Sequence, residues 1–132
     1  MRGVQDEELS VELIVHRSGE NSVVEARADE VIVRDEQDVL DLMASAQHLH
    51  RARAVVVHAV NLADDFFSLK TGLAGAILQK ISNYRFRLAI VGDFAQPESD
   101  ALRDFIRESN RGGQVLFVAS VEDALGRFEI RN

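Results

Sequence analysis

Apolar residues in this chain occur in short runs whose spacing changes between polar turns. Residues 11–16 alternate partly between apolar and polar positions, and residues 22–28 are rich in β-branched and small side chains. The segment 18–21 between these two runs is polar, contains a glycine and is typical of a turn. The pattern therefore predicts a β-hairpin near the start of the chain.

Three later runs are predicted strands, at residues 54–60, 86–91 and 114–118. The run 54–60 is typical of a strand that is covered on both faces. Helical spacing of apolar residues predicts four helices around these runs, with N-caps that satisfy free backbone N–H groups. The helices are expected to begin at Asp35, at Ser68 or Thr71, near Ser99 and at Ser120. The first has an expected buried face of Val39, Leu42, Met43, Ala46 and Leu49. Gly72 and Gly75 predict that the second helix approaches the sheet closely.

The order of these elements is a hairpin followed by helices that alternate with strands. Such alternation predicts a largely parallel sheet joined by right-handed crossovers, to which the hairpin adds an antiparallel pair. We therefore expect one α/β domain over residues 11–132, with a mostly parallel mixed sheet and about four helices, after a flexible acidic leader at residues 1–10. A chain of 132 residues is the usual size of a single domain.

The amino-acid composition argues against several classes of function. The chain has no cysteine, which excludes disulfides, cysteine–zinc sites and thiol catalysis. The net charge of −7 argues against binding to nucleic acid, which needs a basic face. No apolar run reaches the roughly 20 residues that span a bilayer, and the first ten residues lack the apolar core of a signal peptide. We expect a cytoplasmic protein that has no membrane contact and no cofactor.

The segment that joins the run 54–60 to the second helix is the most informative part of the chain. A strand that ends in a loop and opens a helix gathers unpaired backbone N–H groups at one point, where α/β proteins place functional residues. We expect Asn61, Asp93 and Thr71 to share this edge of the sheet. The candidate residues for binding a ligand or partner are Asn61, Asp64, Asp65, Phe66, Phe67, Gly72, Asp93 and Phe94. The three phenylalanines serve either as core residues or as anchors of an interface.

No catalytic motif is recognisable, and no catalytic residue is assigned. Asp64, Asp65 and Asp93 follow neighbouring strands, so their carboxylates are candidates for a magnesium site; the alternative is solvated loop carboxylates. The Lys70-Thr71-Gly72 segment lacks the preceding glycines of a phosphate-binding loop. His16 and His58 lie in expected strands, and His48 and His50 lie on one helix. Each histidine is interpreted as a surface residue or as a satisfied strand residue.

Three segments carry a resemblance to a known family: 66–75 (FFSLKTGLAG), 88–94 (LAIVGDF) and 101–112 (ALRDFIRESNRG). They resemble a small bacterial family known only as a domain of unknown function, DUF4180, over about residues 55–128. The order of elements is also similar to that of the STAS domain of anti-sigma-factor antagonists. In those antagonists a serine at the start of the second helix is phosphorylated by a partner kinase, which switches binding to an anti-sigma factor.

The STAS resemblance implies that Ser68 or Thr71 is a phospho-acceptor. The antagonist motif has Asp-Ser followed directly by a small residue, whereas two phenylalanines separate Asp65 from Ser68 here. The ordinary alternative is that one of the two hydroxyls is only an N-cap. Our first hypothesis is a regulatory module that binds a protein partner around residues 61–72 and 92–96. The alternatives are a small metal- or nucleotide-binding protein or enzyme that uses the aspartates, and a structural homodimer.

Overall fold

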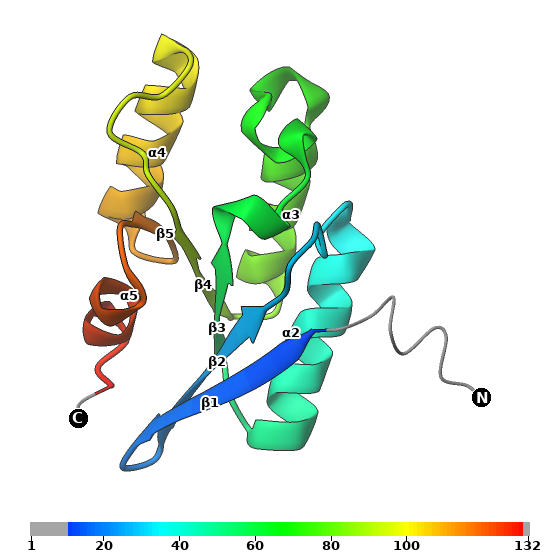
Figure 1. The fold of residues 1–132 in the computed structure, drawn as a ribbon, viewed down its shortest axis with the longest axis vertical. Coiled ribbons are helices and arrows are strands. Elements are labelled where there is room, and N and C mark those ends of the chain that lie inside the picture. Colours follow the sequence, from blue (N-terminus) through cyan, green and yellow to red (C-terminus); the bar gives the residue numbers. More distant parts are fainter. Residues whose placement is uncertain (1–10, 131–132) are drawn as a thin grey trace.

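The computed structural model describes residues 11–130 and contains one five-stranded mixed sheet (Figure 1). The strands are adjacent in chain order, from β1 through β5. Their bounds are β1 Glu12–Ser18, β2 Asn21–Arg27, β3 Ala54–His58, β4 Arg87–Val91 and β5 Val115–Val118. β1 and β2 form the antiparallel hairpin, and all other pairs are parallel. The predicted fold class is confirmed, whereas the predicted leader lies outside the described residues.

Four helices flank the sheet: α2 Glu36–His50, α3 Leu73–Asn83, α4 Asp100–Gly112 and α5 Val121–Arg127. Side chains of α2, α3 and α4 share one apolar core with one face of the sheet. α5 packs on the other face over β4 and β5. Asp35, Ser99 and Ser120 each accept a backbone N–H bond at a helix start, as predicted. Within residues 11–130, no helix is long and apolar enough to cross a membrane.

The segment between β3 and α3 differs from its prediction. β3 ends at His58, and three 3₁₀ turns follow, at Ala59–Asn61, Asp64–Phe67 and Leu69–Thr71. α3 begins only at Leu73, because Gly72 takes the left-handed conformation (φ 83°) and redirects the chain into the helix. The left-handed backbone conformation is strained for a residue that has a Cβ atom, but it costs glycine little. The apolar spacing of this segment therefore does not distinguish a longer strand and helix from three tight turns.

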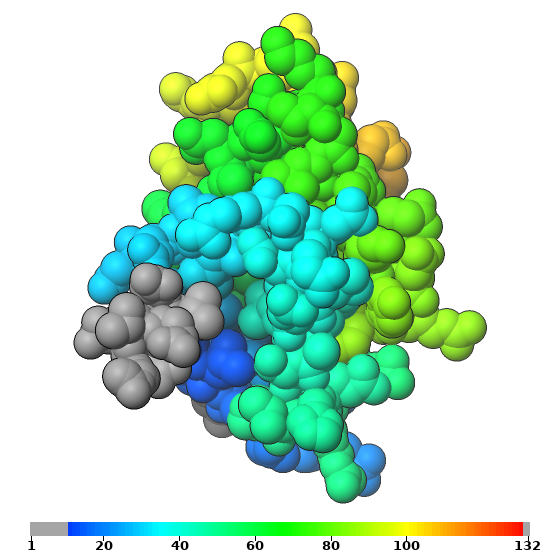
Figure 2. Space-filling model, turned by 90° about the vertical axis from the view of Figure 1, so that its right-hand side faces the viewer, coloured from blue at the N-terminus to red at the C-terminus, as the bar shows by residue number. Residues whose placement is uncertain are grey.

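Two details of helix packing also differ. Leu49 is 61% exposed, because α2 ends one residue later and Arg51 turns the chain in the left-handed region. The buried Ala52 completes the apolar face at that end instead. Gly75 is exposed, and a Cβ built there would meet nothing within 4 Å, so it mediates no close approach to the sheet. Figure 2 shows α2 running across this side of the molecule between α3 and the hairpin.

Candidate functional site

A groove of about 850 Å³ lies between the 3₁₀ segment after β3 and the loop after β4. It lies at the carboxyl ends of two parallel strands, where α/β domains place their ligands. We call it the β3–β4 groove. It is lined by Ala59, Asp64, Phe67, Ser68, Leu69, Lys70, Asp93, Phe94, Gln96, Pro97, Glu98, Ser99, Ala101, Leu102 and Ile106.

Aromatic rings form one wall of the β3–β4 groove. Phe66 is in the core, 1% exposed, and its ring meets that of Phe67 edge to face at 5.1 Å. Phe67 and Phe94 are half-buried, and their ring centroids are 6.3 Å apart. Phe94 also packs edge to face on Phe117 at 5.2 Å. Phe66 is thus a core residue, whereas Phe67 and Phe94 present part of their rings to the groove.

Gly92 allows this aromatic wall to form. A Cβ at this position would lie 2.8 Å from the Cβ of Ala59 and 3.0 Å from the ring of Phe94. Contacts this short do not occur without displacement of one partner, so the chain needs a glycine where β4 ends. The sequence pattern showed a strand end at Gly92 but not this steric requirement.

The polar side chains of the groove are mainly acidic. Asp64, Asp93 and Glu98 are exposed on its lining, together with one basic residue, Lys70. Asp93 also accepts a hydrogen bond from the backbone N–H of Ala95 at 3.1 Å, which orients its carboxylate. The groove therefore combines an aromatic wall with an excess of negative charge.

The two predicted phospho-acceptors have different surroundings. Ser68 is half-buried and lines the groove. The Thr71 hydroxyl instead donates to the carbonyl oxygen of Asp65 at 2.7 Å and accepts from the N–H of Leu73 at 3.2 Å. Thr71 thereby ties the 3₁₀ segment to the first residue of α3, next to the left-handed Gly72. Thr71, Asp65 and Gly72 belong to this helix entry and do not line the groove.

Asn61 lies apart from the groove, 1% exposed. Its Nδ2 donates to the carbonyl oxygens of Ala28 and Glu30, both at 2.8 Å, and its own carbonyl oxygen accepts from the N–H groups of Ile32 and Val33. Asn61 therefore holds the loop after β2 against the end of β3. Of the three residues expected to share one edge, Asp93 lines the groove with Asp64 and Ser68. Asn61 instead lines a second pocket, and Thr71 bonds to the first residue of α3.

The candidate magnesium site gains no support from the geometry. Across the part of the chain that the structure describes, no group of three or more His, Asp or Glu side chains is arranged to hold a metal ion. Asp65 does not line the groove that contains Asp64 and Asp93.

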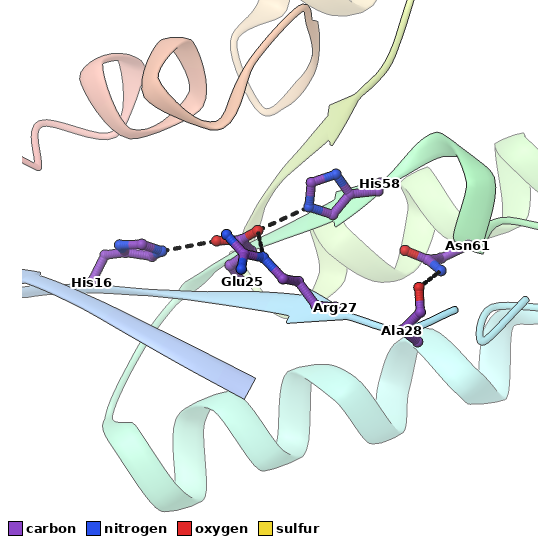
Figure 3. A network of polar contacts seen from close by, with 6 residues as sticks. All are labelled: His16, Glu25, Arg27, Ala28, His58 and Asn61. Atoms are coloured by element: carbon purple, nitrogen blue, oxygen red, sulfur yellow. Dashed lines mark hydrogen bonds and ion pairs between the residues drawn. The ribbon is translucent and has the colours of Figure 1, made fainter. Parts of the chain in front are cut away.

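A second polar site was not predicted: Glu25 on β2 is completely buried and accepts three side-chain hydrogen bonds (Figure 3). His16 Nε2 lies 3.0 Å from Oε1, His58 Nε2 lies 2.9 Å from Oε2, and Arg27 Nε lies 2.8 Å from Oε2. The register of the sheet explains why both histidines contact Glu25. Glu25 pairs with Ile14 on β1 and with Val56 on β3, so each histidine is a diagonal neighbour on the same face.

These contacts determine the ionisation of Glu25 and the tautomers of the histidines. Burial alone would raise the pKa of Glu25, but hydrogen bonds from His58, Arg27 and His16 outweigh it and hold this pKa below its ordinary value. The same carboxylate raises the pKa of Arg27. An ionised carboxylate only accepts hydrogen bonds, so Nε2 of both histidines carries a proton. In the neutral imidazole, Nδ1 then has a free lone pair.

The predicted site residues do not include Glu25, and the sequence pattern does not place His16 and His58 in one cluster. One signal was available, because Glu25 is a single charged residue inside the run Val23-Val24-Glu25-Ala26. A charge within an apolar strand needs a partner if it is buried. The partners lie 9 and 33 residues away, and only the strand pairing brings them together.

Comparison with known proteins agrees with the resemblance noted in the sequence. A family model described as a domain of unknown function, DUF4180, matches residues 18–128. Comparison with curated proteins gives no significant match. The matched segment includes β2 to β5, the whole β3–β4 groove, and the Glu25 cluster apart from His16. The chain belongs to the DUF4180 family.

Proposed function

We propose that this domain is a regulatory protein-interaction module whose β3–β4 groove binds a partner segment rich in apolar and basic residues. The observation that supports the proposal is the aromatic wall of Phe67 and Phe94 beside an acidic lining. Half-buried aromatic side chains concentrate binding energy at interfaces. A pocket of this volume holds a few side chains of a partner.

The charge of the groove defines the chemistry of the partner. Asp64, Asp93 and Glu98 outnumber Lys70 on the lining, so a basic segment is attracted and an acidic one is repelled. Complementary charge mainly raises the association rate and the specificity of an interface. Leucine or phenylalanine side chains of the partner would pack on the aromatic wall, and its lysine or arginine side chains would face the carboxylates.

Regulation would act through Ser68, which lines the groove, rather than through Thr71, whose hydroxyl is engaged at the entry of α3. A phosphate on Ser68 adds between one and two negative charges beside Asp64 and Asp93. It would strengthen the attraction for a basic partner. This regulation is similar in kind to the switch of STAS antagonists, although its position within the segment differs.

Site-specific photo-cross-linking in the native host tests the proposal. A photoreactive residue replaces Lys70 in one variant and Glu98 in another, and a third variant carries it at Glu122 on α5, on the opposite face of the sheet. We expect both groove variants to cross-link one partner through the same segment, with basic and apolar residues, and the α5 variant to give no such product. Mass spectrometry identifies the cross-linked peptide.

Charge variants complete the test. The double variant Asp64→Asn with Asp93→Asn should reduce cross-linking severalfold, and Ser68→Glu should increase it relative to Ser68→Ala. Asn at position 93 keeps an oxygen that accepts from the Ala95 N–H. The proposal is wrong if no product is specific to the groove, if the cross-linked segment is acidic, or if the double variant leaves the yield unchanged.

A further inference from the structure

A second pocket of about 430 Å³ lies at the carboxyl ends of β2 and β3. We call it the β2–β3 pocket, and it shares no lining residue with the β3–β4 groove. The lining residues that matter here are Glu12, Arg27, Asp29, His58, Val60 and Asn61. The pocket adjoins the buried Glu25, because both Arg27 and His58 bond to that carboxylate.

Asn61 places a buried acceptor in this pocket. Both hydrogens of its Nδ2 are used, because Nδ2 donates to two backbone carbonyls at 2.8 Å. Two acceptors on one end of the amide establish which atom is nitrogen, so the other end is Oδ1. Within residues 11–130, no donor bonds to Oδ1, and Figure 3 shows this oxygen turned toward the side of His58. A buried acceptor without a donor is unfavourable.

His58 lines the same pocket. Its Nε2 is directed to Glu25 at 2.9 Å. A carboxylate behind an imidazole fixes the orientation of the ring. Glu25 therefore acts as a positioning residue that holds the His58 ring at the wall of the pocket.

The charges around the pocket favour a cation. Glu12 and Asp29 line the pocket, the Glu25 carboxylate adjoins it, and Arg27 supplies the one guanidinium on the described lining. Arg27 is attracted by both Glu25 and Glu12, whereas Asp29 forms no ion pair within residues 11–130. Val60, which is 77% exposed, adds an apolar wall. Metal binding is not favoured, because no three ligating side chains in the described part of the chain are arranged for it.

We infer that the β2–β3 pocket binds a primary ammonium group, with Asn61 Oδ1 as acceptor, the carboxylates of Glu12 and Asp29 as counter-charges, and Val60 against the alkyl chain. The ligand is either a small free amine or the side chain of a lysine in a protein. This inference does not depend on the partner proposed for the β3–β4 groove.

Titration of the ¹⁵N-labelled domain with n-butylamine, followed by ¹H–¹⁵N NMR at constant ionic strength, tests the inference. Butan-1-ol, which has the same alkyl chain and no charge, serves as the matched probe. We expect saturable shifts of the Ala28, Asp29 and Asn61 amides with butylamine, and none of that size with butanol. Equal responses to both probes would mean that the pocket recognises the alkyl chain rather than the ammonium group, and would overturn the inference.

Two conservative variants locate the binding. Glu12→Gln and Asp29→Asn each remove a charge from an exposed side chain and should weaken butylamine binding about two- to fivefold. Glu122→Gln, at an exposed position on α5, should leave butylamine binding unchanged. Equal weakening by Glu122→Gln would indicate non-specific attraction and contradict the proposed site.

Two further probes distinguish the sources of the amine. Butane-1,4-diamine represents a free amine, and a capped pentapeptide with one central lysine among glycines represents a protein side chain. Saturable binding of either probe at the amides of the β2–β3 pocket supports the inference and identifies the source. Failure of both probes, together with failure of butylamine, would overturn it without affecting the cross-linking test of the groove.

Discussion

His58 Nε2 lies 2.9 Å from Oε2 of Glu25, although the two residues are 33 positions apart in the chain. His58 is at the end of β3, and Glu25 is on the parallel neighbour β2 with a completely buried side chain. A buried carboxylate keeps its charge only when hydrogen bonds and opposite charge replace the lost water. Glu25 has three such donors, so the cluster contributes to stability and also orients two imidazoles.

Replacement of Glu25 should destabilise the domain in a pH-dependent way. Glu25→Gln should lower the free energy of unfolding by about 1–3 kcal/mol at neutral pH, because donors to a buried charge lose their acceptor. The folded-state pKa of Glu25 lies below the ordinary 4.5, so its contribution is present above pH 4.5 and is lost as the pH falls through the folded-state pKa. Urea unfolding of both proteins at pH 5 and pH 2.5 measures this loss.

Comparison of wild type with Glu25→Gln at each pH isolates the contribution of Glu25, because the other titrating groups are present in both proteins. The difference between wild type and Glu25→Gln should shrink from pH 5 to pH 2.5. Glu20→Gln in the exposed hairpin turn is the matched control and should have little effect at either pH. A difference that grows toward pH 2.5 would contradict the lowered pKa of Glu25.

The tautomers of His16 and His58 provide an independent check. Imidazole ¹⁵N spectra recorded above pH 8 should show both rings with the proton on Nε2, because Glu25 accepts from that atom in each. In Glu25→Gln this preference should weaken, since an amide can also donate. His48 and His50 on α2 serve as internal references. Nδ1–H tautomers at position 16 or 58 in the wild type would be incompatible with the observed cluster.

Gly92 and Gly75 should respond in opposite directions to the same substitution. Gly92→Ala places a methyl group 2.8 Å from the Cβ of Ala59 and should destabilise the domain by about 1–3 kcal/mol. Gly75→Ala lies in α3 with nothing within 4 Å of the new methyl group, and should stabilise by roughly 0.5–1 kcal/mol. Thermal or urea unfolding of both variants measures the two effects. Destabilisation by both would refute the steric explanation.

Thr71 should stabilise the entry into α3 through its hydroxyl. Thr71→Ala removes the acceptor for the Leu73 N–H and the donor to Asp65, and should lower the free energy of unfolding by about 0.5–2 kcal/mol. Thr71→Ser keeps the hydroxyl and should retain most of that stability. Ser68→Ala is the comparison within the same segment and should be nearly neutral. Urea denaturation would disprove the assignment if Thr71→Ala proved as stable as wild type.

Much of the fold could be predicted from local patterns. The hairpin followed from alternation around a polar turn, and Asp35, Ser99 and Ser120 proved to be the helix caps that their side chains indicated. The region between β3 and α3 could not be predicted as well, because apolar and aromatic residues there fit a strand, a helix or a 3₁₀ turn. Its path depends on packing of Phe66 in the core and on the left-handed Gly72.

One of the two candidate sites could also be predicted from the sequence, and the other could not. Asp64, Ser68 and Asp93 were predictable as neighbours, because residues after adjacent parallel strands reach the same edge of a sheet. The cluster of Glu25 with His16 and His58 was not, because its members come from three strands and meet only in one register. A shift of one residue in that register would turn the Glu25 side chain to the other face of the sheet.

The sequence by itself determined the order and type of most elements, the mixed α/β class and the resemblance to a family. These properties depend on the period of apolar residues and on capping side chains within a few positions of one another. The tertiary structure alone decided which polar side chains meet, which of them are buried and where the two pockets lie. Those properties arise from contacts between strands and loops far apart in the chain, where register and packing, rather than local propensity, determine each neighbour.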